Sequence, residues 1–159
     1  MNNMKRIFGS GPKGLLVSVM LFWAAYYLKS LLPIPEIFTD QKYFRITVFA
    51  LLTATTIIIF IWSLISLNPK MRGKTLITSG ALQYFRHPLY AAFVSFFNFG
   101  LAVLLNNWVF IIWALLLHPV WHVLVRDEEE ALRRIFPHEY EEYCKRTGRF
   151  FPRIIKQKG

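Results

Sequence analysis

Apolar residues along this chain gather in four long runs, which cover residues 14–32, 46–67, 88–105 and 108–125. A transmembrane helix needs about 20 predominantly apolar residues to cross a bilayer core. Only helices and closed barrels satisfy their backbone hydrogen bonds inside lipid. The pattern therefore predicts an all-α, integral membrane helical bundle with four transmembrane helices.

The boundaries of the last two runs predict how the chain continues. Only Asn106 and Asn107 separate the third run from the fourth, so we expect a tight antiparallel helical hairpin there. Beyond the fourth run the apolar positions become periodic, which predicts an amphipathic extension to about Phe136. Pro137 suits the start of a further short helix, and Gly148 suits its C-terminal cap. The chain should thus end in a cytoplasmic C-terminal amphipathic helix.

Composition agrees with a membrane location, and the distribution of charge adds an orientation. Hydrophobic residues make up 55% of the chain, and the formal net charge is +10. In a soluble protein this charge would suggest a nucleic-acid partner, but here the basic residues lie mostly before, between and after the apolar runs. The positive-inside rule then places both termini and the loop over residues 68–87 in the cytoplasm. We predict a multi-pass protein, of the inner membrane if bacterial, whose partner is the lipid bilayer and not nucleic acid.

Two further features narrow the chemistry. The single cysteine, Cys144, excludes an internal disulfide, and on the cytoplasmic side we expect it to be a reduced thiol. His118 and His122 are four residues apart, as zinc ligands on a helix would be. However, no glutamate follows the first histidine, as the helical zinc protease motif requires. We therefore predict no metal site.

Polar residues that could bind a ligand or take part in a reaction concentrate at the cytoplasmic boundary, in two segments. In the first, Pro88 is placed to begin the third helix, with His87 at its N-cap and Arg86 just outside. A helix N-terminus favours a carboxylate or a phosphate, although such residues also serve as plain headgroup contacts.

The second segment is the acidic run at residues 127–130, at the exit of the fourth helix. Acidic residues near a helix C-terminus oppose the helix dipole, so a cationic group should compensate them. The candidates are a bound ligand and three neighbouring arginines, Arg126, Arg133 and Arg134.

Together these segments resemble the C-terminal half of the isoprenylcysteine carboxyl methyltransferase and phospholipid methyltransferase superfamily. The resemblance covers residues 74–152. It is carried by residues 76–80, by Arg86-His87-Pro88-Leu89-Tyr90, by a helical hairpin, by Glu128-Glu129, and by Leu132, Phe136, Tyr140, Tyr143 and residues 149–152.

The resemblance implies a single methyltransferase domain over residues 1–159, with a two-helix anchor (1–67) and a cofactor-binding half (68–159). It implies a pocket for S-adenosylmethionine at the cytoplasmic ends of the last two helices, covered by the C-terminal tail. The predicted cofactor-binding residues are Lys74, Thr75, Leu76, Ile77, Tyr84, Arg86, His87, Pro88, Leu89, Tyr90, Glu128 and Glu129. Methyl transfer needs alignment of donor and acceptor rather than a covalent nucleophile, so no catalytic residue is assigned.

Three positions depart from the family pattern. Leu82 stands where prenylcysteine methyltransferases have a tyrosine that contacts the cofactor, and Ala92 stands where a small residue, often glycine, is found. Leu124 stands where an arginine meets the substrate, which leaves Arg126 as the candidate substrate contact. The acceptor is therefore open between an isoprenylcysteine-type carboxylate, a lipid amine, and a thiol or other lipophilic molecule.

Two other functions compete with methyl transfer. Sterol-reductase-like membrane enzymes share a similar Arg-His-Pro and tyrosine-rich arrangement and use NADPH, although this chain is short for their full set of helices. Alternatively, Leu82 and Leu124 could mark a noncatalytic membrane protein with a degenerate site.

Overall fold

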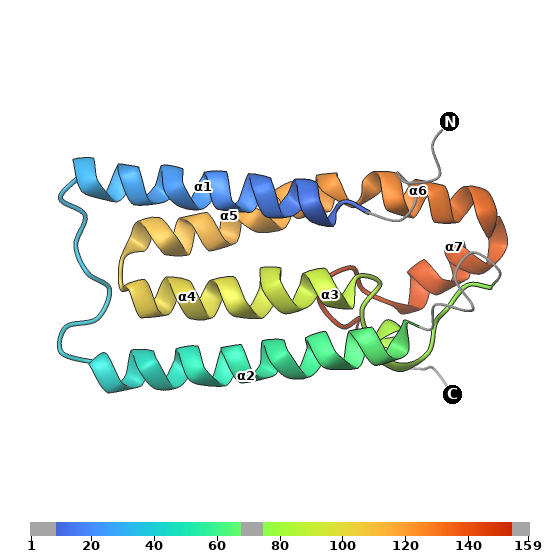
Figure 1. The fold of residues 1–159 in the computed structure, drawn as a ribbon, viewed down its shortest axis with the longest axis horizontal. Helices are drawn as coiled ribbons and strands as arrows, with labels where there is room; N and C mark the ends of the chain where they lie inside the picture. The colour runs from blue at the N-terminus through green and yellow to red at the C-terminus, as the bar shows by residue number, and fades with distance from the viewer. Residues whose placement is uncertain (1–8, 68–74, 154–159) are drawn as a thin grey trace.

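The computed structural model describes residues 9–67 and 75–153, in which helices are joined by loops (Figure 1). Two isolated bridges, and no strand, occur among the described residues. The elements in chain order are α1 (Gly11–Leu31), α2 (Lys42–Ser66), the 3₁₀ helix η3 (Gly80–Gln83), α3 (Pro88–Ala91), the π-helical turn η4 (Ala92–Phe97), α4 (Asn98–Leu105), α5 (Trp108–Leu124), α6 (Arg126–Ile135) and α7 (Pro137–Arg146). The predicted all-α class is confirmed.

Four helices in the described ranges are long and apolar enough to cross a membrane: Gly11–Leu31, Lys42–Ser66, Pro88–Leu105 and Trp108–Ile135. They match the four predicted runs, and the third is α3, η4 and α4 in one continuous stretch. The helices α1 and α2 begin a few residues before their apolar runs. Helical hydrogen bonding extends past the apolar residues because a helix can continue into the polar interface.

The four long helices pack in an order that differs from their order in the sequence. In Figure 1, α1 lies along α5, α5 lies along the stretch from α3 to α4, and α2 covers the opposite side of that stretch. The hairpin of α4 and α5 thus forms the centre of the bundle. As a result, the start of α1 lies beside the end of α5, at the end of the bundle that also holds α6 and α7. We call this the α6–α7 end.

The opposite end of the bundle is closed by the predicted two-residue turn. Asn106 adopts a left-handed conformation with φ of 54°, which its short polar side chain tolerates. Its side-chain amide donates to Glu36 Oε2 (2.8 Å) and to the carbonyl oxygen of Phe38 (3.0 Å). The side chain of Asn107 caps α5 by accepting from the Val109 N–H (3.1 Å). These bonds attach the central hairpin to the connection between α1 and α2.

The third membrane helix widens into a π-helical turn near the α6–α7 end. Thr56 on α2 donates its hydroxyl to the carbonyl oxygen of Ala92 at 3.2 Å, and Ser95 donates to the carbonyl oxygen of Phe150 at 3.2 Å. π-helical turns inside α-helices often occur at functional sites. Here the turn brings the third membrane helix into contact with the C-terminal tail, the described residues 147–153 after α7.

The C-terminal elements follow the predicted course, with one difference at Gly148. The amphipathic extension is α6, and Pro137 is the first residue of α7. Gly148, expected as the cap of α7, instead forms a bridge with Phe85. A Cβ at this position would overlap the carbonyl oxygen of Phe151. A glycine is therefore needed here, because the tail turns back and brings the Phe151 carbonyl oxygen close to the Cα atom of Gly148.

Candidate functional site

The site begins with the short segment before α3, which pairs with the C-terminal tail. The Arg86 N–H donates to the carbonyl oxygen of Gly148 (2.7 Å), and the His87 N–H donates to that of Arg149 (3.2 Å). As predicted, Pro88 is the first residue of the helix and His87 is its N-cap. The tail is thus held directly against the start of the third membrane helix.

Glu129 on α6 is the buried centre of a charge network, with 2% of its surface exposed. Arg86 Nε donates to Glu129 Oε1 at 3.0 Å, and Arg149 Nε donates to the same oxygen at 2.9 Å. His87 Nε2 lies 3.3 Å from this oxygen. A buried carboxylate is costly unless cations and hydrogen bonds compensate it. The compensation expected for the acidic run is therefore supplied here by two arginines that are distant in the sequence.

Arg149 extends the network to the end of α5. Its NH1 group lies 2.8 Å from His122 Nδ1 and donates to the His122 carbonyl oxygen at 3.3 Å. The hydrogen bond to Glu129 raises the pKa of Arg149 further above its already high value. From the sequence, Arg149 belongs to the motif at residues 149–152, which predicts no contact for its side chain. The structure identifies it as the residue that links the tail to α5 and α6.

Glu128 differs from Glu129 because its side chain is partly open, with 24% exposed. Tyr90 donates its hydroxyl to Glu128 Oε1 at 3.0 Å, and His87 Nδ1 lies 3.6 Å from Glu128 Oε2. The ring of His87 therefore stands between the two glutamates. Three of the predicted site residues, from two segments about 40 positions apart, meet at this point.

Aromatic rings border the two carboxylates. His87 stacks on Tyr90 with ring centroids 5.6 Å apart, and Tyr90 contacts Trp121 of α5 at 4.7 Å. Phe150 of the tail is buried and lies 4.9 Å from the ring of His122. Trp121 was not identified from the sequence, because no local signal distinguishes it from the other tryptophans of the apolar runs.

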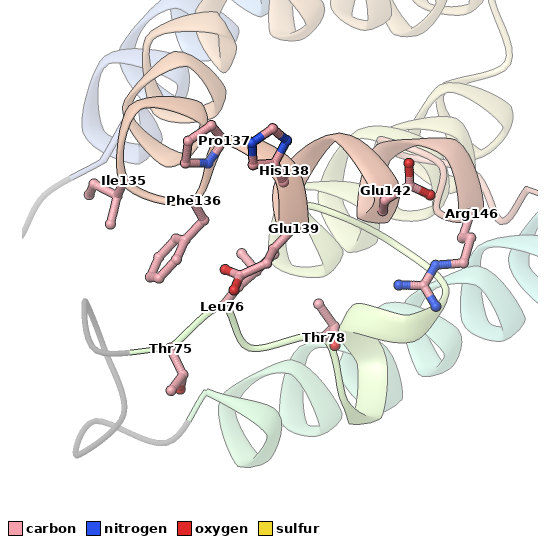
Figure 2. Close-up of a pocket in the computed structure, with 10 residues that line it drawn as sticks. All are labelled: Thr75, Leu76, Thr78, Ile135, Phe136, Pro137, His138, Glu139, Glu142 and Arg146. Atoms are coloured by element: carbon pink, nitrogen blue, oxygen red, sulfur yellow. The ribbon is translucent and has the colours of Figure 1, made fainter.

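A separate cavity of about 760 Å³ lies between the segment after residue 74 and the turn from α6 to α7 (Figure 2). Thr75, Leu76 and Thr78 line one wall. The other wall consists of Ile135, Phe136, Pro137, His138, Glu139, Glu142 and Arg146. The predicted stretch before η3 thus borders this cavity, and the residues around Glu128 do not line it. Lys74 lies outside the described residues.

The remaining predicted residues take different positions. Tyr84 is half exposed and its ring faces Trp62 of α2 at 5.6 Å, while Ile77 and Leu89 are partly buried. Arg126, the candidate substrate contact, is exposed on α6.

The three positions that depart from the family pattern serve packing and backbone contacts. Leu82 is buried, and its carbonyl oxygen accepts a hydrogen bond from Tyr143 at 2.6 Å. Ala92 is buried at the start of the π-helical turn. The Leu124 carbonyl oxygen accepts the hydroxyl of Ser10 at 2.6 Å.

Comparison with known proteins points to one family. A family model described as the isoprenylcysteine carboxyl methyltransferase (ICMT) family matches residues 41–134, more than half of the chain. This region runs from α2 through most of α6 and holds His87, Tyr90 and both glutamates. No solved structure matches the chain.

Two curated relatives carry names that refer to metal resistance. The cobalt-zinc-cadmium resistance protein CzcN of Cupriavidus metallidurans is 34% identical over 89 residues, which are 55% of this chain and 40% of that protein. The nickel-cobalt-cadmium resistance protein NccN of Alcaligenes xylosoxydans xylosoxydans is 34% identical over 84 residues, 52% of this chain and 38% of that protein. The matched region thus spans about two fifths of each relative.

Proposed function

The chain belongs to the isoprenylcysteine carboxyl methyltransferase family, and from this membership we propose that it transfers a methyl group from S-adenosylmethionine to a lipophilic acceptor. Membership supports a membrane methyltransferase type of function. The observation that carries the finer proposal is the partly open carboxylate of Glu128 beside the rings of His87, Tyr90 and Trp121. The metal-resistance names of the two relatives describe those proteins, and too little of either is covered for the names to transfer.

The residues around Glu128 fit the chemistry of this cofactor. S-adenosylmethionine supplies, when bound, a methyl group on a positively charged sulfur. Aromatic faces attract such a cation, and the ring of Tyr90, packed on the buried Trp121, offers one. A carboxylate accepts hydrogen bonds from an ammonium group or from ribose hydroxyls, and Glu128 is the partly open one of the pair. We therefore assign cofactor contact to Glu128, Tyr90 and His87, with Pro88 and Leu89 behind them.

Glu129 has a different role in this proposal. Its side chain is enclosed by Arg86, His87 and Arg149, so it holds these side chains in place. His87 is oriented from both sides, because each ring nitrogen faces one of the two glutamates. Contact of Arg86 or Glu129 with the cofactor itself stays a prediction. The buried Phe150 and the tail that carries it exclude water from this corner.

The cavity beside Thr75 and Leu76 is proposed as a second part of the binding region. It combines apolar side chains of the turn from α6 to α7 with Thr75 and Leu76, which belong to the stretch that the family resemblance associates with the cofactor. Contacts by Lys74, Ile77 and Tyr84 stay predictions of the same kind.

The acceptor is proposed to be lipophilic because the site lies at one end of four membrane helices. Leu124 offers no charge for an acceptor carboxylate, and Arg126 is the nearest basic residue in the sequence that could replace the missing arginine. We therefore propose two alternative acceptors, an isoprenylcysteine-type carboxylate and a lipid amine. The basic residues of the sequence between the second and third apolar runs and after the fourth run support a cytoplasmic orientation of the α6–α7 end and of both termini.

The proposal is tested by thermal stabilisation of the full chain in detergent. A ligand that binds only the folded state raises apparent stability by mass action. We expect S-adenosylmethionine and S-adenosylhomocysteine to raise the melting temperature, and NADPH to leave it unchanged. A shift with NADPH alone would favour the reductase function, and no shift with any of the three would favour a noncatalytic protein.

Variants connect the ligand to the site. We expect Glu128→Ala and His87→Ala to weaken binding of S-adenosylhomocysteine at least tenfold, while membrane insertion stays intact. Glu130→Ala is the matched control, because Glu130 is exposed on the same helix as Glu128 and lies in a surface ion pair with Arg134. Equal affinity in all three variants would reject the assignment of the site.

A further inference from the structure

Gly9 and Ser10, directly before α1, reach the candidate cofactor site from the other end of the sequence. The backbone N–H of Ser10 donates to Glu128 Oε1, and the Ser10 hydroxyl donates to the Leu124 carbonyl oxygen at 2.6 Å. Ser10 itself is buried, with 8% exposed. A polar residue at the start of the first membrane helix is thus bonded twice to the junction of α5 and α6, 114 and 118 positions away.

The neighbouring glycine permits this contact. A Cβ on Gly9 would overlap the carboxylate of Glu128 and would lie 3.3 Å from the hydroxyl oxygen of Tyr90. A Cβ on Gly11 would lie 3.5 Å from the same hydroxyl oxygen, in ordinary contact. The close approach to Glu128 therefore depends on the absence of a side chain at Gly9.

Two donors fix the orientation of the Glu128 carboxylate. Oε1 accepts from the Ser10 N–H and from the Tyr90 hydroxyl (3.0 Å), and it is covered by Gly9. Oε2 has a looser neighbour, His87 Nδ1 at 3.6 Å. Since an ionised carboxylate offers about four acceptor positions, Oε2 keeps capacity for another donor. Among the described residues, the Tyr90 hydroxyl is the donor that would still hold Oε1 if the Ser10 N–H were absent.

We propose that Ser10 is a positioning residue for the cofactor site, and that its backbone N–H holds Glu128 so that Oε2 is presented to donor groups of the cofactor. This inference rests on the proposed function. The backbone group carries the effect, so the side chain of Ser10 matters only for the bond to Leu124. If Gly9 and Ser10 instead blocked the site, removing the contact would tighten cofactor binding. The experiment therefore separates positioning from blocking by the sign of the change in affinity.

The test compares two substitutions at one position in the full chain in detergent. Ser10→Pro removes the N–H and suits the local backbone, because Ser10 has φ of −62°, the value that proline imposes. Ser10→Ala keeps the N–H and removes the bond to the Leu124 carbonyl. The measured quantities are the dissociation constant of S-adenosylhomocysteine by calorimetry and the melting temperature of the ligand-free protein.

We expect Ser10→Pro to weaken binding about tenfold, the size of one hydrogen bond to a charged group, and Ser10→Ala to stay within about twofold. The loss should disappear when Ser10→Pro is placed in a Glu128→Ala background, because the acceptor of the Ser10 N–H is then absent. Unchanged affinity in Ser10→Pro, or an equal loss in both backgrounds, would overturn the proposal. Tighter binding would overturn it too, because the segment would then be blocking the site.

A second variant keeps the test decisive if Ser10→Pro does not fold. Gly9→Ala retains every backbone N–H but forces the segment away from the carboxylate, so we expect weaker binding in the same direction. An affinity equal to that of the wild-type protein would contradict the inference. If the wild-type protein binds neither adenosyl compound, the proposed function fails and this inference fails with it. Binding by the wild-type protein with no effect of any variant overturns the inference alone.

Discussion

Replacing Glu129 by glutamine removes the negative charge at the centre of the buried network while keeping the shape of the side chain. The side chain is 3% exposed, so water cannot replace the lost charge. Arg86 and Arg149 would then stay in place as cations without their counter-ion, and His87 Nε2 would lose its carboxylate neighbour. Stability should fall because both arginines are held at this point by the rest of the fold.

The magnitude follows from the contacts. Arg86 and Arg149 donate three hydrogen bonds to Glu129. At about 1.5–3 kcal/mol each, their sum overstates the loss, because glutamine keeps one acceptor oxygen and coupled contacts are not additive. Loss of one partner of a buried ion pair costs about 3–5 kcal/mol. For a chain of this length the melting temperature would fall by roughly 10 °C.

The assay is thermal unfolding in detergent, without ligand, of Glu129→Gln beside the exposed control Glu142→Gln. A double-mutant cycle with Arg149→Met isolates the coupling between the two residues, and we expect the second substitution to cost much less after the first. The reasoning is refuted if Glu129→Gln melts within error of Glu142→Gln, or if the effects of Glu129→Gln and Arg149→Met simply add.

Two other outcomes are expected. Burial raises the pKa of Tyr143, so the unfolded chain loses this proton from about pH 10 while the folded protein keeps it. The contribution of Tyr143 to stability is therefore constant below about pH 10 and decreases above it. Melting temperatures between pH 8 and pH 11 should show a smaller decrease in Tyr143→Phe, and identical curves would contradict this. Gly148→Ala should detach the tail, because its Cβ would overlap the Phe151 carbonyl oxygen. Faster hydrogen exchange at the Arg86 and His87 amides measures this, and unchanged protection would show that the tail adapts.

The hydrophobic pattern predicted the helices because each membrane helix satisfies its backbone hydrogen bonds within its own segment. Four runs and a two-residue turn were therefore enough to predict four helices and a hairpin of the last two. The start of the third helix was also predictable from the sequence, because it depends on two adjacent residues, Pro88 and its N-cap His87. The end of α7 was less predictable. Gly148 is needed for an approach of the tail to itself, which no helix pattern contains.

Membership of the ICMT family was expected from residues alone, because the motifs around His87 and the glutamate pair are short and contiguous. The sequence could not assign different roles to Glu128 and Glu129. They are adjacent, of the same type and in one acidic run. Only the packing of α6 against the tail buries Glu129 among cations and leaves Glu128 partly open.

By itself, then, the sequence determined four segments long and apolar enough to cross a membrane and predicted the site residues at their ends, because both depend on local composition and spacing. Only the tertiary structure decided which of these residues meet. Arg149 reaches Glu129 and His122 because the tail folds back over α5. Ser10 donates to Glu128 through its backbone N–H, which every residue except proline has, so the type of residue at position 10 does not predict this contact. Such contacts depend on how helices distant in the sequence pack, and that information lies in the assembled bundle.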